Sequence, residues 1–268
     1  MDINIVSLLT LNVCGIASKF LYNILTKYLE KFDIICLSET KLYNIPPGEF
    51  PNYDIISLKQ KSSLHGISII IRSGLFPYVK KVSSTTSKCV LWVLVGSSNK
   101  DFTFLVGSVY IPGEGSKFSD KHDFEQICED ITALSTKYAC PLVLMGDFNS
   151  RTGTLCDFYD AFENFSDTEL KQNTNSQGIV TDRYNSDKKV DTHGRNLIKM
   201  CRDFSLNIVN GRFGNDKKEG KFTCLKPTGH SVVDYAVVSN CLLPFIVNFH
   251  IDVFDRCMSD VHVPVGKY

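Results

Sequence analysis

Apolar runs of strand length and one long periodic segment open the chain. Residues 3–13 and 33–40 are apolar runs that predict strands. Between them, around residues 18–31, apolar side chains recur three and four positions apart, which places them on one face of a helix. Its members are Leu21, Ile24, Leu25, Tyr28, Leu29 and Phe32. The order predicts a strand–helix–strand unit, because two parallel strands need a crossover of this kind.

The middle of the chain follows a different pattern. The segments "YDIISLK", "GISIIIRS", "CVLWVLVGS" and "DFTFLVGSVYIP" predict short strands with no helix between them, as in an antiparallel meander. A helix is then predicted at residues 120–138, and a buried strand leads through the apolar run 142–145 to Asp147. The polar, nearly aperiodic residues 165–191 are typical of a long surface loop.

A last helix and further strands complete the pattern. The helix is predicted in "GRNLIKMCRDF" and the strands in "LNIVNG", "KFTCL", "VVDYAVVS" and "NFHIDVF". Strand–helix–strand units at two points, with antiparallel strands between them, predict an α/β fold: a four-layer α/β sandwich of two mixed sheets packed face to face with helices outside. We interpret residues 1–268 as a single domain. A further strand is expected after "PVGKY", so the domain is expected to lack its last strand and to belong to a longer polyprotein.

Composition narrows the class of protein without identifying an activity. The net charge is zero, so no overall basic field draws the chain to nucleic acid or to an anionic membrane, although a local basic patch is compatible with that total. The ten cysteines form no CxxC pair, which argues against a zinc site, and we interpret them as reduced thiols of an intracellular protein. No apolar stretch reaches about 18 residues, and no targeting signal is visible.

Polar side chains close or interrupt several of the apolar runs. In "LMGDFNSR" the buried strand ends on Asp147 and Asn149, which are two residues apart and therefore lie on one side of an extended chain. Turn chemistry explains one such pair, and a ligand site at the carboxyl end of a sheet is the alternative. The other residues of this kind are Asn12, Glu39, Tyr110, Asp234, Asp260 and His262. So many strands with polar ends favour a site over a set of turns.

The motifs around these residues resemble the endonuclease/exonuclease/phosphatase superfamily, and within it the apurinic-endonuclease-like nucleases. In chain order they are "LNVCG", "LSET", "YIP", "GDFN", "VDY" and "SDVHVPV". "LSETKL" and "GRNLIKMCRDFSLNIVNGRF" are similar to the endonuclease domains of LINE-type (non-LTR) retrotransposons. The resemblance implies a DNase I-like fold and a metal-dependent endonuclease. Tyr110 favours a nuclease, because the phosphatase, sphingomyelinase and deadenylase branches usually carry an Asn-Thr-His stretch at that place.

The residues also suit the chemistry of phosphodiester hydrolysis, which needs an activated water and relief of negative charge in the transition state. Glu39 is the best candidate ligand of Mg²⁺, or of Mn²⁺ as the alternative ion, and Asn12, at the end of the neighbouring strand, is expected beside it in the metal site. Asp147 would orient and deprotonate the attacking water. Asn149, on the same face, would position water or phosphate. The resemblance assigns the same roles to these positions.

Three more residues are expected on the phosphate side of the site. His262 would donate a hydrogen bond to a non-bridging phosphate oxygen, and Asp234 would fix its tautomer and raise its pKa. Tyr110 would bind the phosphate or assist the leaving oxygen. Thr223 in "KFTCL" matches a threonine that contacts DNA in the retrotransposon branch, although threonine is also common in strands.

One departure from the family pattern concerns the metal. The family usually has an aspartate directly before the histidine, whereas Val261 separates Asp260 from His262 here. Residues two apart share a face of an extended chain, so Asp260 remains a candidate metal ligand with altered geometry. A bulge at Val261 would instead turn it away.

Other charged residues have simpler interpretations. The histidines outside the motifs are expected to be solvated, and a basic stretch is typical of an exposed loop, with DNA contact as the alternative. The histidines are His65, His122, His193 and His230, and the basic stretch is Arg212, Lys217, Lys218 and Lys221.

Three functions are compatible with the sequence. The first is a LINE-type DNA endonuclease that nicks target DNA, expected to be nuclear, monomeric, fused to a reverse transcriptase and free of any membrane. The second is a cellular abasic-site repair endonuclease, which would need an apolar pocket for the flipped-out sugar. The third is a decayed copy that binds nucleic acid or a partner without cutting, and the retained core residues argue against it.

Overall fold

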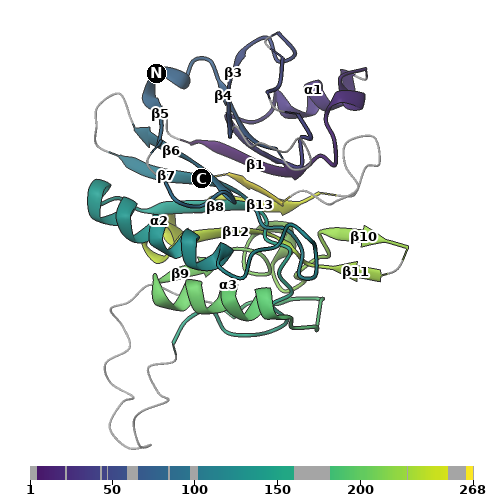
Figure 1. Ribbon diagram of the computed structural model, residues 1–268, viewed down its shortest axis with the longest axis vertical. Coiled ribbons are helices and arrows are strands. Elements are labelled where there is room, and N and C mark those ends of the chain that lie inside the picture. The colour runs from purple at the N-terminus through teal and green to yellow at the C-terminus, as the bar shows by residue number, and fades with distance from the viewer. Residues whose placement is uncertain are drawn as a thin grey trace, which may run out of the picture.

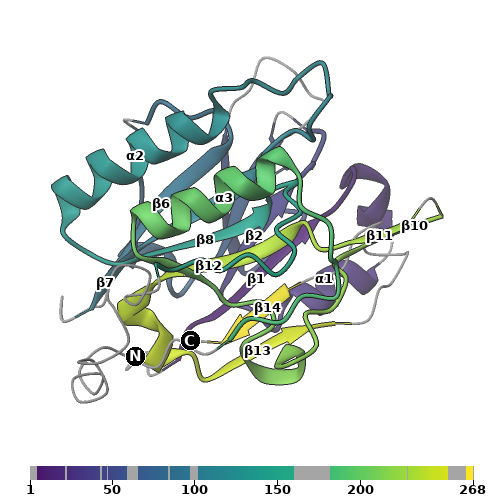
Figure 2. The same cartoon turned by 90° about the horizontal axis from the view of Figure 1, so that it is seen from below.

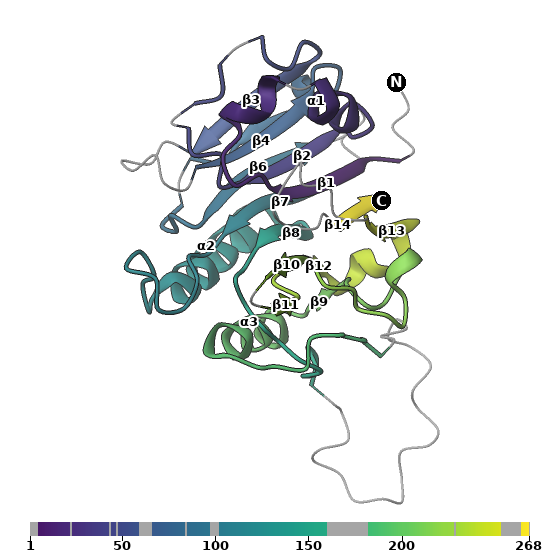
Figure 3. The ribbon, with the colours of Figure 1, turned by 90° about the vertical axis from the view of Figure 1, so that its right-hand side faces the viewer.

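The structure is a computed structural model of the chain. It describes residues 5–21, 23–42, 44–46, 48–58, 66–83, 85–96, 102–159, 182–227, 229–252 and 264–267. Two six-stranded sheets pack face to face, with α1 outside the first sheet and α2 and α3 outside the second (Figures 1 and 3). The predicted fold class, a four-layer α/β sandwich, is confirmed.

The first sheet has the strand order β13-β14-β1-β2-β4-β3. Its strands are β1 (Ser7–Asn12), β2 (Ile34–Ser38), β3 (Tyr53–Leu58), β4 (Ile67–Arg72), β13 (Asn248–Ile251) and β14 (Pro264–Lys267). β1 and β2 are parallel, as predicted, and their register ends with Asn12 opposite Ser38. The crossover contains a 3₁₀ turn, η1 (Ala17–Leu21), and α1 (Asn23–Leu29) in place of one long helix. Apolar periodicity locates the buried face of such a segment but does not fix the hydrogen-bond pattern of each turn.

The second sheet has the order β5-β6-β7-β8-β12-β9. Its strands are β5 (Val79–Lys81), β6 (Val90–Gly96), β7 (Thr103–Tyr110), β8 (Leu142–Asp147), β9 (Leu206–Ile208) and β12 (Asp234–Ser239). The helix α2 (Asp123–Tyr138) connects β7 to the parallel strand β8, and α3 (Thr192–Asp203) lies beside α2 over the same face (Figure 2). The hairpin of β10 (Cys224–Lys226) and β11 (Gly229–Ser231) projects from the body of the molecule (Figure 1). Short 3₁₀ turns are η2 (Phe76–Tyr78), η3 (Gly214–Asp216) and η4 (Asn240–Phe245).

Strand β8 shows how the sequence produces the layers. Val143 and Met145 face the core between the two sheets, whereas Leu142 and Leu144 pack toward α2 and α3. A strand covered on both faces buries every side chain, and each large apolar side chain so buried contributes roughly 1.5–3 kcal/mol. β2 is built in the same way, with Cys36 facing the inter-sheet core and Leu37 facing α1.

Two expectations about charged residues are wrong. His193 is buried in α3 and packs edge-on against the ring of Phe124, because the first turn of this helix faces α2 instead of solvent. Arg212 is also buried, and its guanidinium forms two hydrogen bonds of 2.6 and 2.7 Å with Asp157, so it cannot contact DNA as part of an exposed basic stretch. The ion pair joins residues 55 positions apart, which no local charge pattern reveals.

Membrane association and disulfide bonding were both expected to be absent. Within the described ranges, no helix combines the length and apolar character needed to cross a bilayer. The nine cysteines in the same ranges are all free thiols.

Candidate active site

Three of the expected catalytic residues stand in a line across the second sheet. Asp147, the last residue of β8, is directly opposite Tyr110 of β7 and Asp234 of β12. Side chains at directly opposite positions share a face of the sheet and lie close together. Gly146 precedes Asp147 with φ +154°, and a Cβ there would lie 2.0 Å from the Val109 carbonyl oxygen. Only glycine therefore allows β8 to approach β7 this closely before the acid.

The first sheet contributes Asn12 and Glu39 to the same place. Asn12 ends β1, and Glu39 follows the neighbouring strand β2. The Asn12 Nδ2 donates to Glu39 Oε1 and to Asp147 Oδ2, each at 2.9 Å, so one amide group bridges the two sheets. Its Oδ1 accepts a 3.0 Å hydrogen bond from the Cys14 amide, which fixes the orientation of the amide.

Two tight turns hold the acids in this arrangement. Asn149 has φ +45°, and both its amides bind Asp147: the backbone N donates to Oδ1 at 2.8 Å and Nδ2 to Oδ2 at 3.2 Å. Asn149 Nδ2 also donates to the carbonyl oxygen of Ile111 at 2.8 Å. Glu39 has φ +50°, a left-handed conformation that asparagine tolerates and glutamate rarely adopts. Strain of this kind, of about 1–3 kcal/mol for a residue, is concentrated at functional sites.

Burial dominates the electrostatics of the acids, and repulsion from neighbouring carboxylates adds to it. Asp147 is 4% exposed and Asp234 is 2% exposed. Burial raises the pKa of Asp147 to about 7, against hydrogen bonds from Asn149 and Asn12 that lower it. Burial, and then the charge of Asp147, raises the pKa of Asp234 well above its usual value, and Glu39 adds to the rise in both. A cation placed here would relieve this repulsion.

The hydroxyl of Tyr110 is held in its protonated form. Burial, followed by the charges of Glu39 and Asp147, raises the pKa of Tyr110 far above neutral pH. A hydrogen bond between the hydroxyl and Glu39 contributes to the rise. Tyr110 is therefore available only as a hydrogen-bond donor or as a neutral acceptor at neutral pH.

The oxygen donors of the site suit a hard divalent cation. The side chain of Glu39 is the most exposed of the acids, at 21%, and its Oε2 lies 3.8 Å from the Lys41 ammonium, so a positive charge already faces this carboxylate. Mg²⁺ commonly takes one or two carboxylates and keeps several waters. Across the described residues, no three or more acidic, histidine or cysteine side chains are grouped so that they could hold a metal ion together. Asn12 directs its amide nitrogen toward the acids, so in this geometry it orients Glu39 and Asp147.

Thr223 lies behind the line of acids. It is fully buried, and its Oγ1 accepts hydrogen bonds of 3.0 Å from the amides of Val233 and Asp234. A further hydrogen bond from Thr223 to the Asp234 carboxylate lowers the pKa of that acid, against the larger effect of burial. The structure thus makes Thr223 a support of Asp234, and its contact with substrate stays a prediction.

Two expected site residues, His262 and Asp260, lie outside the described residues. Asp234 Oδ2 is buried and has no hydrogen-bond partner within the part of the chain that is described. An unpaired carboxylate oxygen of this kind fits an imidazole N–H, which is the partner predicted for it.

One residue that the sequence did not single out affects the pKa of the acids from a distance. Lys226, in β10 of the projecting hairpin, lowers the pKa of both Asp147 and Asp234 through its charge, against the larger effect of burial. A single lysine in a hairpin carries no signal in sequence, because only the register of the hairpin brings it toward the acids.

Comparison with known proteins identifies the family. Residues 9–247 match the model of the Endonuclease/Exonuclease/phosphatase family. The chain belongs to this family. As its name states, the endonuclease/exonuclease/phosphatase family consists of enzymes that hydrolyse phosphate esters, and the predicted resemblance is confirmed. No curated protein sequence matches the chain.

Three solved structures share the fold of this family member. The AP endonuclease LMAP from Leishmania major has a TM-score of 0.71 and 14% identity, covering 98% of this chain and 87% of its own. The endonuclease domain of TRAS1, a telomere-specific non-LTR retrotransposon, has a TM-score of 0.64 and 15% identity, and the match covers 98% of this chain and 97% of the TRAS1 domain. The 3′ phosphatase NExo from Neisseria, bound to a product DNA hairpin, has a TM-score of 0.61 and 17% identity, and the match covers 97% of this chain and 98% of NExo. At these identities the likeness establishes the fold.

Proposed function

We propose that the protein is a Mg²⁺-dependent DNA endonuclease of the LINE type, which nicks target DNA. The observation that carries the proposal is the Asn12 amide, which holds Glu39 from one sheet and Asp147 from the other within hydrogen-bonding distance of a single nitrogen. Tyr110 at the end of β7 favours a nuclease within the family, and the similarity to the TRAS1 endonuclease domain supports the retrotransposon branch.

Asp147 is the proposed general base. A carboxylate with a pKa near neutral pH is well matched to removing a proton from the attacking water. Asn149 fixes the Asp147 carboxylate through two hydrogen bonds and presents its own amide beside it. A divalent ion held by Glu39 would supply charge neutralisation for the phosphate and lower the pKa of bound water.

The opposite side of the scissile phosphate is assigned to Tyr110, Asp234 and His262. The protonated Tyr110 hydroxyl donates to a phosphate oxygen. Asp234 accepts the imidazole N–H of His262, which leaves the other ring nitrogen directed at the phosphate. Asp260 is proposed to support the ion with less effect than an aspartate adjacent to the histidine would have.

The proposal extends to the context of the enzyme. We propose that the domain works in the nucleus as a monomer on DNA and is fused to a reverse transcriptase, as the retrotransposon assignment requires. Mn²⁺ is the ion expected to replace Mg²⁺ with retained activity, because both prefer oxygen ligands.

A plasmid-nicking assay tests the function directly. The protein should convert supercoiled plasmid to the open-circular form with Mg²⁺ and not with EDTA, and Asp147→Asn should abolish the conversion. Duplexes with and without an abasic site separate the retrotransposon assignment from the abasic-repair alternative, which would cut only the abasic duplex. DNA binding without cleavage under every metal condition would identify a decayed copy and refute the proposal.

A further inference from the structure

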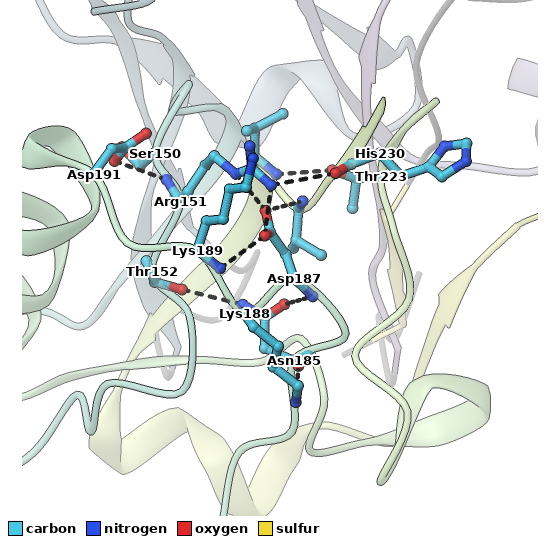
Figure 4. Close-up of polar contacts among 12 residues, drawn as sticks. Ser150, Arg151, Thr152, Asn185, Asp187, Lys188, Lys189, Asp191, Thr223 and His230 are labelled. Atoms are coloured by element: carbon cyan, nitrogen blue, oxygen red, sulfur yellow. Dashed lines mark hydrogen bonds and ion pairs between the residues drawn. The ribbon is translucent and has the colours of Figure 1, made fainter. Parts of the chain in front are cut away.

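An ion pair outside the line of acids connects the turn that follows Asp147 to the segment that precedes Asp234. Arg151 binds Asp187 with two parallel hydrogen bonds of 2.7 Å, from Nε to Oδ2 and from Nη2 to Oδ1 (Figure 4). Asp187 is 2% exposed and Arg151 is 26% exposed. A two-point contact of this kind fixes orientation as well as distance, and it is stronger than a single hydrogen bond.

The same ion pair also forms hydrogen bonds with the backbone of residues 230–232, just before Asp234. Asp187 Oδ2 accepts a hydrogen bond of 3.2 Å from the amide of Val232. Arg151 Nη2 donates to the carbonyl oxygen of His230 at 3.3 Å (Figure 4). Val232 lies two residues before Asp234, between it and the hairpin. The ion pair therefore holds the backbone just before Asp234 at two points.

The Arg151–Asp187 ion pair, here called the clamp, is also connected to the Asn149 turn. Arg151 is two residues after Asn149, and its backbone amide donates to Asp191, the residue that caps α3, at 3.0 Å (Figure 4). Gly194, in the first turn of α3, packs so closely on Arg151 that a Cβ there would lie 1.9 Å from the Arg151 carbonyl oxygen. The arginine backbone is thus held by a rigid helix end while its side chain holds the hairpin.

We propose that Arg151 and Asp187 are positioning residues, which hold the Asn149 turn and the Asp234 strand in one mutual geometry. This role rests on the proposed nuclease function. Neither side chain contacts Asp147 or Asp234, so they would act on catalysis only through the positions of the groups they hold. A displacement of about 1 Å in a catalytic group can cost on the order of 10²-fold in rate, which gives such a clamp a measurable effect.

The test compares this pair with an ion pair at the far end of the other sheet. The variants are Arg151→Gln, Arg151→Lys, Asp187→Asn and the double change Arg151→Gln with Asp187→Asn. The matched control is Arg72→Gln with Asp33→Asn, since Arg72 Nε binds Asp33 at 2.8 Å at the end of β2 opposite Glu39. Each variant is assayed for kcat and KM on supercoiled plasmid and for hydrogen exchange at the amides of residues 232–234.

The proposal expects kcat to fall about 10- to 100-fold with KM nearly unchanged, while the control pair keeps wild-type kcat. Arg151→Lys should recover part of the loss, because one ammonium keeps the charge without the two-point contact. The double variant should be no slower than the worse single variant, since either change breaks the same clamp. Exchange at residues 232–234 should be faster in the Arg151 and Asp187 variants than in the control.

Two results would overturn the positioning role. One is a kcat equal to wild type in all Arg151 and Asp187 variants at a temperature where they are folded. The other is exchange at residues 232–234 that is no faster than in the control. A wild-type protein that fails to nick DNA would refute the proposed function, and the exchange measurement would still decide whether the clamp holds these residues.

Discussion

The substitution Asp147→Asn, which replaces a buried carboxylate by an amide, should make the protein more stable relative to the wild type as the pH rises. Burial raises the pKa of Asp147 from 3.8 to about 7. The folded state therefore holds this proton more tightly than the unfolded state does, and the free energy of unfolding of the wild type falls as pH rises from about 4 to about 7. Asp147→Asn removes the titrating group and with it this part of the pH dependence.

The magnitude follows from the size of the shift. A rise from 3.8 to about 7 is roughly three pKa units, and each unit is worth about 1.4 kcal/mol, so the stability gained by the variant should grow by about 4 kcal/mol between pH 4 and pH 8. The asparagine also loses hydrogen bonds, since Asn12 Nδ2 and both amides of Asn149 donate to the original carboxylate. The pH-dependent part of these hydrogen bonds is already contained in the net pKa shift, because they lower the pKa of Asp147, and the pH-independent part cancels when the two pH values are compared.

Urea unfolding in EDTA, followed by the fluorescence of the single tryptophan, gives the measurement. Trp92 is buried in β6, so its emission reports on loss of the second sheet. Asp216→Asn is the matched control: burial raises the pKa of Asp216 to about 6, and this acid lies in η3, outside the line of acids. Its stability difference should be about 3 kcal/mol over the same range, with its midpoint at lower pH. A pH-independent effect of Asp147→Asn, or one that favours the wild type at high pH, would refute the argument from burial.

Three further predictions test the catalytic assignments. Glu39→Gln should remove most nicking and raise the Mg²⁺ concentration that half-saturates the rate, with little change in DNA affinity; an unshifted metal titration with a wild-type rate at excess Mg²⁺ would exclude Glu39 as the ligand. Tyr110→Phe should lower kcat about 10- to 100-fold with KM for DNA nearly constant, and equal kcat values would show that the hydroxyl does not reach the phosphate. His262→Ala should lower the rate about 10²- to 10³-fold and Asp260→Ala clearly less, with deletion of Val261 as the comparison. An Asp260→Ala enzyme as inactive as His262→Ala would show that the acid keeps its full role.

The fold could be predicted because its signals are local. Residues 142–145 contain no polar side chain, and the structure buries this run between two layers. The parallel pairs were predicted from the two crossovers, and their register brings Asp147 beside Tyr110. The helix around residues 18–31 was predicted from its apolar face, but its division into two short segments depends on backbone geometry that periodicity does not encode.

The residues of the site were predictable to the extent that strand ends and family motifs mark them. The structure brings six of them together, namely Asn12, Glu39, Tyr110, Asp147, Asn149 and Asp234, with Thr223 behind them. The connections between them were not predictable, because they join residues distant in sequence. Arg151 lies two residues after "GDFN", yet its partner Asp187 is 36 residues away, just as the pairing of Arg212 with Asp157 spans 55 residues.

The arrangement of the acids explains why the site needs this much support. Asp147 and Asp234 are buried at directly opposite positions, and Glu39 adds a third negative charge from the other sheet. In the ionised state these groups destabilise the fold, so the strand ends would separate unless other contacts held them. The Asn12 amide holds the two sheets together at this point, and the Arg151–Asp187 pair holds the two turns of the second sheet. Burial of the ionised acids, with the repulsion among them added, therefore raises the free energy of the folded protein, and a bound cation would offset both effects. The proposed metal affinity and the pH-dependent instability thus have the same physical origin.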